Sequence, residues 1–454
     1  MLILQFFFNN IGIAQTLTGY GNISITSVAT DVNKGTWTNT STQYTFYPKA
    51  NGSNVSVTDI QTNLAKGDVV ISSICSTCTE SGIISVTSKI SLPTNFSLPI
   101  LARTFSINTN SDINILASID FSTSTSSLKS SITPSIYLSS INGNIKINSN
   151  CLIKTNRTVA EDDLLSGNVS LFAQNGVVSI NSEINTSTVT SKAGQVGGNI
   201  TIYGKNGINI NGNLNATSVK SGSLSVTTYN PVSDLTNQGQ ISGTIKVASF
   251  EKLGTGIFQL KGANIWTGNT SITGSLILGA DNSIPSISAV IFNGGSLIPN
   301  GFNNTLNSIR VTSDSYIDYD PDLLGIITFN SFDYTNSTAN KYLIIKDWQG
   351  YTQPNALDKY GNLVPTSSVF VNSNGGVQSN STPGGLNQYG QILSSKVSGG
   401  LKGKLYAPNT ITGASLTSTL EKIRFITNGI TYNSNFISST NNKIEIIPDL
   451  AVNP

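Results

Sequence analysis

A pair of cysteines is the first candidate for chemistry in this sequence. Cys75 and Cys78 are separated by two residues and lie between two runs of alternating apolar residues, so we expect them in a turn. In an exported protein such a pair is most simply a local disulfide, and the alternatives are two free thiols or a metal or redox site. A zinc site would need more ligands, and the chain offers only Cys151 and no histidine. We predict a Cys75–Cys78 disulfide and a buried thiol at Cys151.

Two groups of carboxylates are the other candidates. Asp318, Asp320 and Asp322 stand at alternate positions, so on a strand they would share one face, where hard oxygen ligands suit Ca²⁺. The alternative is a solvated loop edge, and no other cofactor is predicted. The run 161–163 (Glu-Asp-Asp) interrupts a repeated pattern. We expect it either in a loop that projects from the fold and carries function, or in a plain solvated loop.

Composition excludes several classes of function. Charged residues make up 11 % of the chain and the formal net charge is +2, so no strong field attracts nucleic acid or acidic lipid. The absence of histidine removes the commonest general base and metal ligand. No run reaches the roughly 18 apolar residues that span a bilayer, so no transmembrane segment is predicted.

The elements that must position these side chains belong to a repeat. The run that starts at Val169 aligns without a gap with the run that starts at Ile200, and related runs start at Phe105 and Tyr137. Each unit holds two short alternating runs joined by a turn such as Asn-Gly, which indicates strands with one buried face. The repeat is about 31 residues long, the offset between Val169 and Ile200. A repeat of that length, made of strands and turns, buries its apolar face only by stacking on neighbouring repeats. We predict an all-β chain: a right-handed parallel β-helix with a small β-rich C-terminal module. Its handedness follows the rule for parallel crossovers, and its Asn and Thr side chains should stack along the axis.

The regions flanking the repeats differ in composition. Residues 1–14 resemble a signal peptide without a basic start, and the small-x-small spacing that ends at Ala14 predicts cleavage there. Residues 15–66 are rich in aromatics (Trp37, Tyr44, Phe46 and Tyr47), which predicts a cap over the first coil or, alternatively, contacts with a ligand. The repeats then fill 67–248.

Two stretches resemble known families. Residues 51–71 resemble the entry motif of the filamentous-haemagglutinin type of secreted bacterial β-helix. Residues 249–311 resemble the autotransporter-associated β-strand repeat, on Gly254-Thr-Gly256, Gly262-Ala-Asn-Ile-Trp266-Thr-Gly268 and Gly274-Ser-Leu-Ile-Leu-Gly279. These resemblances imply a β-helix displayed on a bacterial surface, without a catalytic motif. Residues 312–454 resemble the closing segment of such proteins, with loops over 351–400 and a short helix over 415–422.

A polysaccharide lyase or hydrolase is the main rival hypothesis, because such enzymes use the same scaffold. They need carboxylates gathered from neighbouring coils on one face. Aligned on the turn glycines, Asp112 should stack on Gly82 and Gly143, and Glu183 on Leu214, so the acids do not gather. We therefore expect a secreted, non-enzymatic surface protein, structural and adhesin-like. Its partners would be other copies, other surface proteins or glycans, and not nucleic acid.

Overall fold

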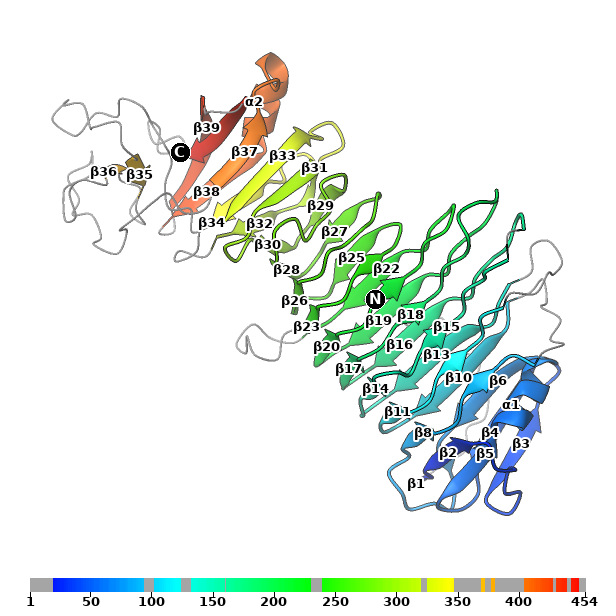
Figure 1. The fold of residues 1–454 in the computed structure, drawn as a ribbon. Helices are drawn as coiled ribbons and strands as arrows, with labels where there is room; N and C mark the ends of the chain where they lie inside the picture. The colour runs from blue at the N-terminus through cyan, green and yellow to red at the C-terminus, as the bar shows by residue number, and fades with distance from the viewer. Residues whose placement is uncertain are drawn as a thin grey trace.

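Nearly every element of this protein is a β-strand. The structure, a computed structural model, describes residues 19–93, 102–123, 132–159, 161–229, 239–319, 325–346, 404–427, 430–438 and 442–448, with the strands 369–371 and 377–379. The strands stack into long, mostly parallel sheets, from the end beside helix α1 (Val57–Leu64) to the end formed by β37 (Lys404–Pro408) and β38 (Ile423–Thr427) (Figure 1). The prediction of an all-β chain of repeated parallel strands is confirmed.

Two long parallel ladders hold most of the strands. Ladder 1 consists, in spatial order, of β5 (Ser53–Ser56), β2 (Ile23–Thr26), β8 (Ile84–Val86), β11 (Ile113–Ile115), β14 (Ile145–Ile147), β17 (Val177–Ile180), β20 (Gly207–Ile210), β23 (Gly239–Ile241), β26 (Ile257–Leu260), β28 (Ser275–Leu278), β30 (Ser296–Ile298), β32 (Ser315–Asp318), β34 (Leu343–Lys346) and β38. Ladder 2 consists of β4 (Gln43–Pro48), β6 (Asp68–Ser72), β10 (Thr104–Thr109), β13 (Ser135–Ser140), β16 (Val169–Ala173), β19 (Ile200–Gly204), β22 (Leu224–Thr227), β25 (Phe250–Leu253), β27 (Thr270–Ile272), β29 (Ala289–Asn293), β31 (Asn304–Ser313), β33 (Ile326–Phe332) and β37.

A third, shorter ladder ends where the coils change length. Ladder 3 consists of β9 (Ile90–Ser91), β12 (Ile119–Asp120), β15 (Ile153–Lys154), β18 (Ile184–Asn185), β21 (Leu214–Asn215) and β24 (Ile245–Lys246). While it lasts, the residues that ladder 2 pairs lie between 24 and 36 positions apart, for example Val169 with Ile200 and Ile200 with Leu224. After β24, Phe250 pairs with Thr270 and Thr270 with Val290, so each coil takes about 20 residues. A coil that has lost one of its three strands needs a shorter chain.

The core consists of columns of aliphatic side chains that run from coil to coil. In ladder 1, Ile113, Ile145, Val178 and Ile208 occupy one register position on successive strands, and all four are fully buried. Alternation with period two turns the residues between them outward. Each coil therefore buries its apolar side chains only against its neighbours, as stacked repeats do.

The N-terminal end is covered by antiparallel strands and by a helix. β3 (Gly35–Asn39) pairs antiparallel with β4, and β1 (Gly19–Tyr20) pairs antiparallel with β7 (Ile74–Cys75). The entry-motif match over 51–71 did not predict helix α1. Its sequence signals are Ser56, whose hydroxyl accepts a hydrogen bond from the Thr58 amide (3.1 Å), and the buried pair Ile60 and Leu64 at helical spacing.

The C-terminal end is closed by two antiparallel strands. β40 (Lys443–Pro448) pairs with β37, β39 (Ile430–Ser438) pairs with β38, and β39 also pairs with β40, so the two long ladders are joined there. The helix predicted over 415–422 is found as α2 (Gly413–Glu421). Within 351–400, predicted as loops, the structure describes an antiparallel pair, β35 (Val369–Val371) and β36 (Val377–Ser379). No helix in the described ranges is long and apolar enough to span a membrane.

Candidate functional site

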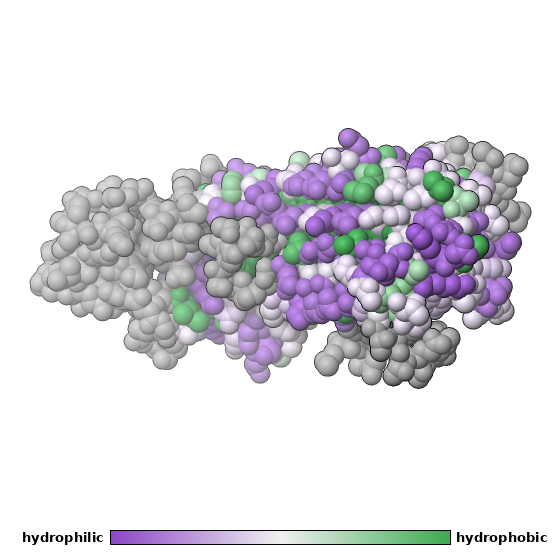
Figure 2. Space-filling model, turned by 90° about the horizontal axis from the view of Figure 1, so that it is seen from below, coloured by the Kyte–Doolittle hydropathy of each residue, from purple (hydrophilic) through white to green (hydrophobic). Residues whose placement is uncertain are grey.

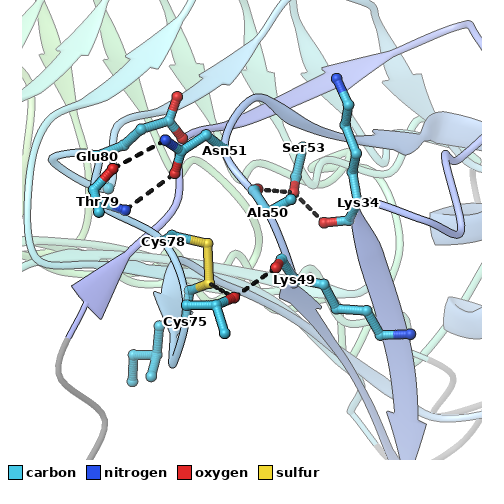
Figure 3. Close-up of a disulfide and its surroundings, with 12 residues drawn as sticks. Lys34, Lys49, Ala50, Asn51, Ser53, Cys75, Cys78, Thr79 and Glu80 are labelled. Atoms are coloured by element: carbon cyan, nitrogen blue, oxygen red, sulfur yellow. Dashed lines mark hydrogen bonds between the residues drawn. A yellow bond between two sulfur atoms is a disulfide. The ribbon is translucent and has the colours of Figure 1, made fainter.

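The cysteine pair is structural and fastens the N-terminal cap. Cys75 and Cys78 are joined by a disulfide with a Cα–Cα distance of 5.5 Å, and both are buried. The turn that the disulfide closes lies beside the segment 49–53 (Figure 3). Thr79 exchanges two hydrogen bonds of 3.1 Å with the Asn51 side chain, and the Glu80 carboxylate accepts hydrogen bonds from the backbone amides of Asn22 (2.7 Å) and Gly52 (3.0 Å). The disulfide therefore holds the turn that ties β2 and the 49–53 segment together.

The third cysteine takes no part in this arrangement. Cys151 is a free, buried thiol between β14 and β15, and burial raises its pKa. A thiol with a raised pKa is a weaker nucleophile at neutral pH than an exposed one. This position suits the small buried side chain that the sequence predicted there.

The calcium candidate is described only in part. Asp318 ends β32 and lies in register with Lys346 of β34, while Asp320 and Asp322 lie outside the described residues. Within the part of the chain that the structure describes, no group of three or more His, Cys, Asp or Glu residues is placed to hold a metal ion. The calcium site remains a prediction.

The acidic run 161–163 is followed by backbone that rejoins the stack. The Asp163 amide donates to the Ala193 carbonyl (3.0 Å) in the next coil, and Gln195 donates to the Glu161 carbonyl. Leu165 then forms parallel bridges with Ile132 and Val196. Residues 161–163 lie in a loop and turn in which Asp162 and Asp163 are exposed, as the solvated-loop alternative expects, and the backbone that follows pairs with the coils on either side.

Two register predictions for the acids were off by one residue. Asn144, not Gly143, lies beside Asp112, and its amide donates to the Asp112 carboxylate (2.7 Å). Glu183 lies beside Asn213 rather than Leu214, because Ile184 pairs with Leu214. The coils differ slightly in length, so a single offset does not hold along the array. Neither acid lies beside another acid in the corrected register.

The clearest candidate site, which the sequence analysis missed, is a groove on the outer face of ladder 2. It has a volume of about 380 Å³ and crosses five successive strands of ladder 2. One register column forms its floor, and the column follows the order Thr201, Ser225, Glu251, Ser271 and Ile291. Strands in neighbouring coils lie about 4.8 Å apart, so this column is roughly 19 Å long and runs along the axis of the stack.

A second polar column borders this groove at the start of the strands. It contains Asn199, Ser223, Ser249 and Asn269. The Asn199 side chain accepts from the Ser223 amide (2.8 Å), and the hydroxyls of Ser223 and Ser249 are hydrogen-bonded (2.8 Å). These contacts hold the side chains in place, so the border is pre-organised.

An aromatic column lies beside the groove on the same outer face. Tyr203 follows Thr201 by two residues on β19, so the two side chains share a face. The rings of Tyr137, Phe172, Tyr203 and Tyr229 follow one another at centroid distances of 5.4, 6.0 and 6.0 Å. Burial in this stack, and secondarily the neighbouring Tyr229, raises the pKa of Tyr203. The aromatic column is a rigid apolar edge next to a hydroxyl-rich floor.

The chemistry available in the groove is hydrogen bonding rather than catalysis by a carboxylate pair. Glu251 is the one carboxylate among the residues that line it, with Ser225 and Ser271 on either side. Glycoside hydrolysis ordinarily needs two carboxyl groups about 5–9.5 Å apart. The groove therefore offers an anionic point within a row of neutral hydroxyl and amide groups.

Stacked asparagines form a side-chain ladder along the axis, but they lie in turns and not in the strands, where ladders of Asn and Thr were predicted. Asn142 donates to the Asn110 side chain (2.8 Å), and Asn175 donates to the Asn142 side chain (3.1 Å). Figure 2 shows one face of the molecule, where the described residues are mostly hydrophilic or intermediate and the apolar patches are small and scattered. The face in this view is thus mostly polar.

Comparison of the chain with known proteins leaves the family open. The chain matches no family model, no curated protein and no solved structure. The resemblance to filamentous-haemagglutinin and autotransporter-associated repeats accordingly remains a hypothesis based on the motifs in 51–71 and 249–311.

Proposed function

We propose that this chain is a secreted bacterial surface protein that acts as a rigid adhesive rod. Its scaffold is a right-handed parallel β-helix of the kind that carries filamentous-haemagglutinin and autotransporter-associated repeats. The rod binds an extended neutral polysaccharide along the outer face of ladder 2. The groove floored by Thr201, Ser225, Glu251 and Ser271 is the observation that carries this proposal.

A periodic groove favours a periodic ligand. Hydroxyl groups of Thr201, Ser225 and Ser271 lie along the floor, with Glu251 between the two serines, and the polar border column runs beside them. A polysaccharide presents hydroxyls at a regular interval along its chain, so it can form the same hydrogen bonds in several coils. Many weak, repeated contacts give avidity without a deep pocket.

Export is supported by the cap. A disulfide such as Cys75–Cys78 persists in an oxidising environment outside the cytosol. The predicted signal peptide, 1–14, agrees with that location but lies outside the described residues. Calcium at Asp318, Asp320 and Asp322 is not needed for this function.

Two other functions are less well supported. A polysaccharide hydrolase would need a second carboxylate near Glu251, and the groove lining contains none. Growth of a fibre by pairing of end coils would need free strand edges at both ends. At the C-terminal end, the last strands of the parallel ladders instead pair with β39 and β40. At the N-terminal end, β3 and β5 each pair with one strand and leave the other edge without a partner among the described strands.

The groove can be tested by blocking it. Affinity electrophoresis in gels that contain a soluble neutral glucan, mannan or xylan measures binding by the whole chain. Ser225→Trp places a bulky ring in the groove floor and should weaken binding at least tenfold. Ser179→Trp is the matched control, because Ser179 is an outward serine on β17 of ladder 1, away from the groove.

The outcomes separate the alternatives. Retardation of the wild type and of Ser179→Trp, with loss in Ser225→Trp, supports the proposal. If the wild type is not retarded by any of the polymers, or if both variants bind equally, the groove is not a polysaccharide site. New reducing ends that appear during incubation with a polymer would support the hydrolase instead.

A further inference from the structure

A second cavity lies at the N-terminal tip, remote in sequence from the groove. It has a volume of about 440 Å³, within the range of roughly 300–1,000 Å³ that is usual for small-molecule sites. The hairpin of β3 and β4, helix α1 and the loop before β3 form its walls. The antiparallel hairpin and the helix belong to the cap, so this cavity is absent from the repeated coils.

One wall of the tip cavity is aromatic. In the β3–β4 hairpin, Trp37 is in register with Phe46 and Asn39 with Tyr44, so these four side chains lie on the same face. Phe46 is fully buried, and Trp37 packs edge-on against it with a centroid distance of 5.5 Å. The half-buried indole is thus held in place, and both Trp37 and Tyr44 line the cavity.

The opposite wall is polar. Asp59 and Asn63 are four residues apart on α1, so they lie on the same side of the helix. The Thr30 hydroxyl donates to the Asp59 carboxylate and accepts from the Ser56 amide (2.9 Å), which orients the carboxylate. The Asn63 amide group makes no side-chain hydrogen bond with the residues that the structure describes, so its donors and acceptor are available to a ligand.

The rim of the tip cavity is unusually apolar. Val32 lines the cavity and is 72 % exposed, and Val28, on the same loop, is 67 % exposed. Among the described large apolar side chains that are exposed, these two are the most exposed. A ligand seated in the cavity would remove the Val32 side chain from water.

The charged residue among those that line the tip cavity is Asp59, and its carboxylate disfavours an anion. The indole of Trp37 offers an apolar face, and the Asp59 carboxylate and the Asn63 amide can hydrogen-bond to hydroxyls. This combination suits a neutral ligand that has one apolar face and several hydroxyls.

We propose that the tip cavity binds a single neutral sugar ring, with the C–H face of the ring against Trp37 and its hydroxyls on Asp59 and Asn63. The site is independent of the groove on ladder 2, and either can exist without the other. It would let the end of the rod hold a terminal sugar residue, whereas the groove holds the length of a polymer.

Binding can be measured by saturation-transfer NMR and by titration calorimetry with the methyl glycosides of glucose, galactose and mannose. Tetramethylammonium and acetate serve as the cationic and anionic probes. At least one glycoside should bind, and neither ion should. Asn63→Ala should weaken the binding at least fivefold, whereas Thr58→Ala, an exposed threonine on the same helix outside the cavity, should leave it unchanged.

A further variant distinguishes a loss of binding from a folding defect. Trp37→Phe keeps an aromatic ring on Phe46 and should still weaken binding, with the chain melting at an unchanged temperature. The proposal is overturned if no glycoside binds at 50-fold molar excess and millimolar concentration, if tetramethylammonium or acetate binds instead, or if Asn63→Ala and Trp37→Phe both bind as the wild type does. Ser225→Trp should bind the glycosides normally, which separates this site from the groove.

Discussion

Lys252 occupies the register position that Val226 holds one coil earlier, inside ladder 2. Its other neighbour is Ile272, and its side chain is fully buried in the coil where the repeat shortens. The ammonium group donates to the backbone carbonyls of Leu253 and of Gly254 (3.1 Å). Burial lowers its pKa to about 7. An apolar column is thus interrupted by an amine that is only partly protonated at neutral pH.

We predict that Lys252 makes stability rise with pH. The unfolded lysine keeps the ordinary value of 10.5, so between about pH 7 and 10.5 the unfolded chain binds more protons than the folded one, and raising the pH favours folding. The full shift corresponds to roughly 5 kcal/mol. Chemical denaturation at pH 7 and at pH 10 should show a higher midpoint at the higher pH.

The Lys252→Met variant should remove this dependence. Met fills the same apolar column without a charge, so the variant should be more stable than the wild type at pH 7 by several kcal/mol. Lys246→Met, at an exposed position in β24, is the control and should change the midpoint little. If the stability of Lys252→Met depends on pH as the stability of the wild type does, Lys252 is not desolvated in the folded chain.

The disulfide should stabilise the cap more than the array. Closing so short a loop is worth about 2 kcal/mol. In the double variant Cys75→Ser and Cys78→Ser, hydrogen exchange should become faster in β1, β2 and the 49–53 segment and stay unchanged near β16 and β19. Uniformly faster exchange along the whole chain would contradict a local role for the disulfide.

Where glycines of successive coils stack closely, we expect that no larger side chain is tolerated. A Cβ at Gly198 would lie 2.0 Å from the carbonyl oxygen of Gly167 in the preceding coil. We expect Gly198→Ala to cost more than about 3 kcal/mol, because backbone atoms must move apart. Gly52→Ala, where φ is +66° and the space is open, should cost only about 1 kcal/mol. Equal thermal shifts in the two variants would contradict this distinction.

The N-terminal helix should keep the rod monomeric. Ile60 and Leu64 of α1 are buried in the core. Leu64→Asp should displace the helix, expose the first coil and produce oligomers by sedimentation velocity, whereas the wild type sediments as a monomer. Asp59→Ala, on the same helix, is expected to remain monomeric. Ordered filaments of the wild type would instead revive end-to-end assembly.

Much of the scaffold follows from local sequence. The alternation around Val169 and Ile200 determines strands with one buried face, because the side-chain period of a strand is two. Asn-Gly turns at regular intervals determine where each coil turns. The asparagines at 142 and 175 stack because equivalent positions in successive coils face each other. The helix α2 and a surface that is polar with few charges were predictable in the same way.

Tertiary structure alone decided which positions lie side by side. The partner of Asp112 is Asn144 because one coil is a residue longer than another, and such differences accumulate in loops that carry no periodic signal. Lys252 looks like a surface residue in sequence and points inward only because β25 pairs with β22 in that register. The groove at Ser225 and the tip cavity at Trp37 join residues from several strands. Their existence depends on non-local packing, which a one-dimensional pattern does not contain.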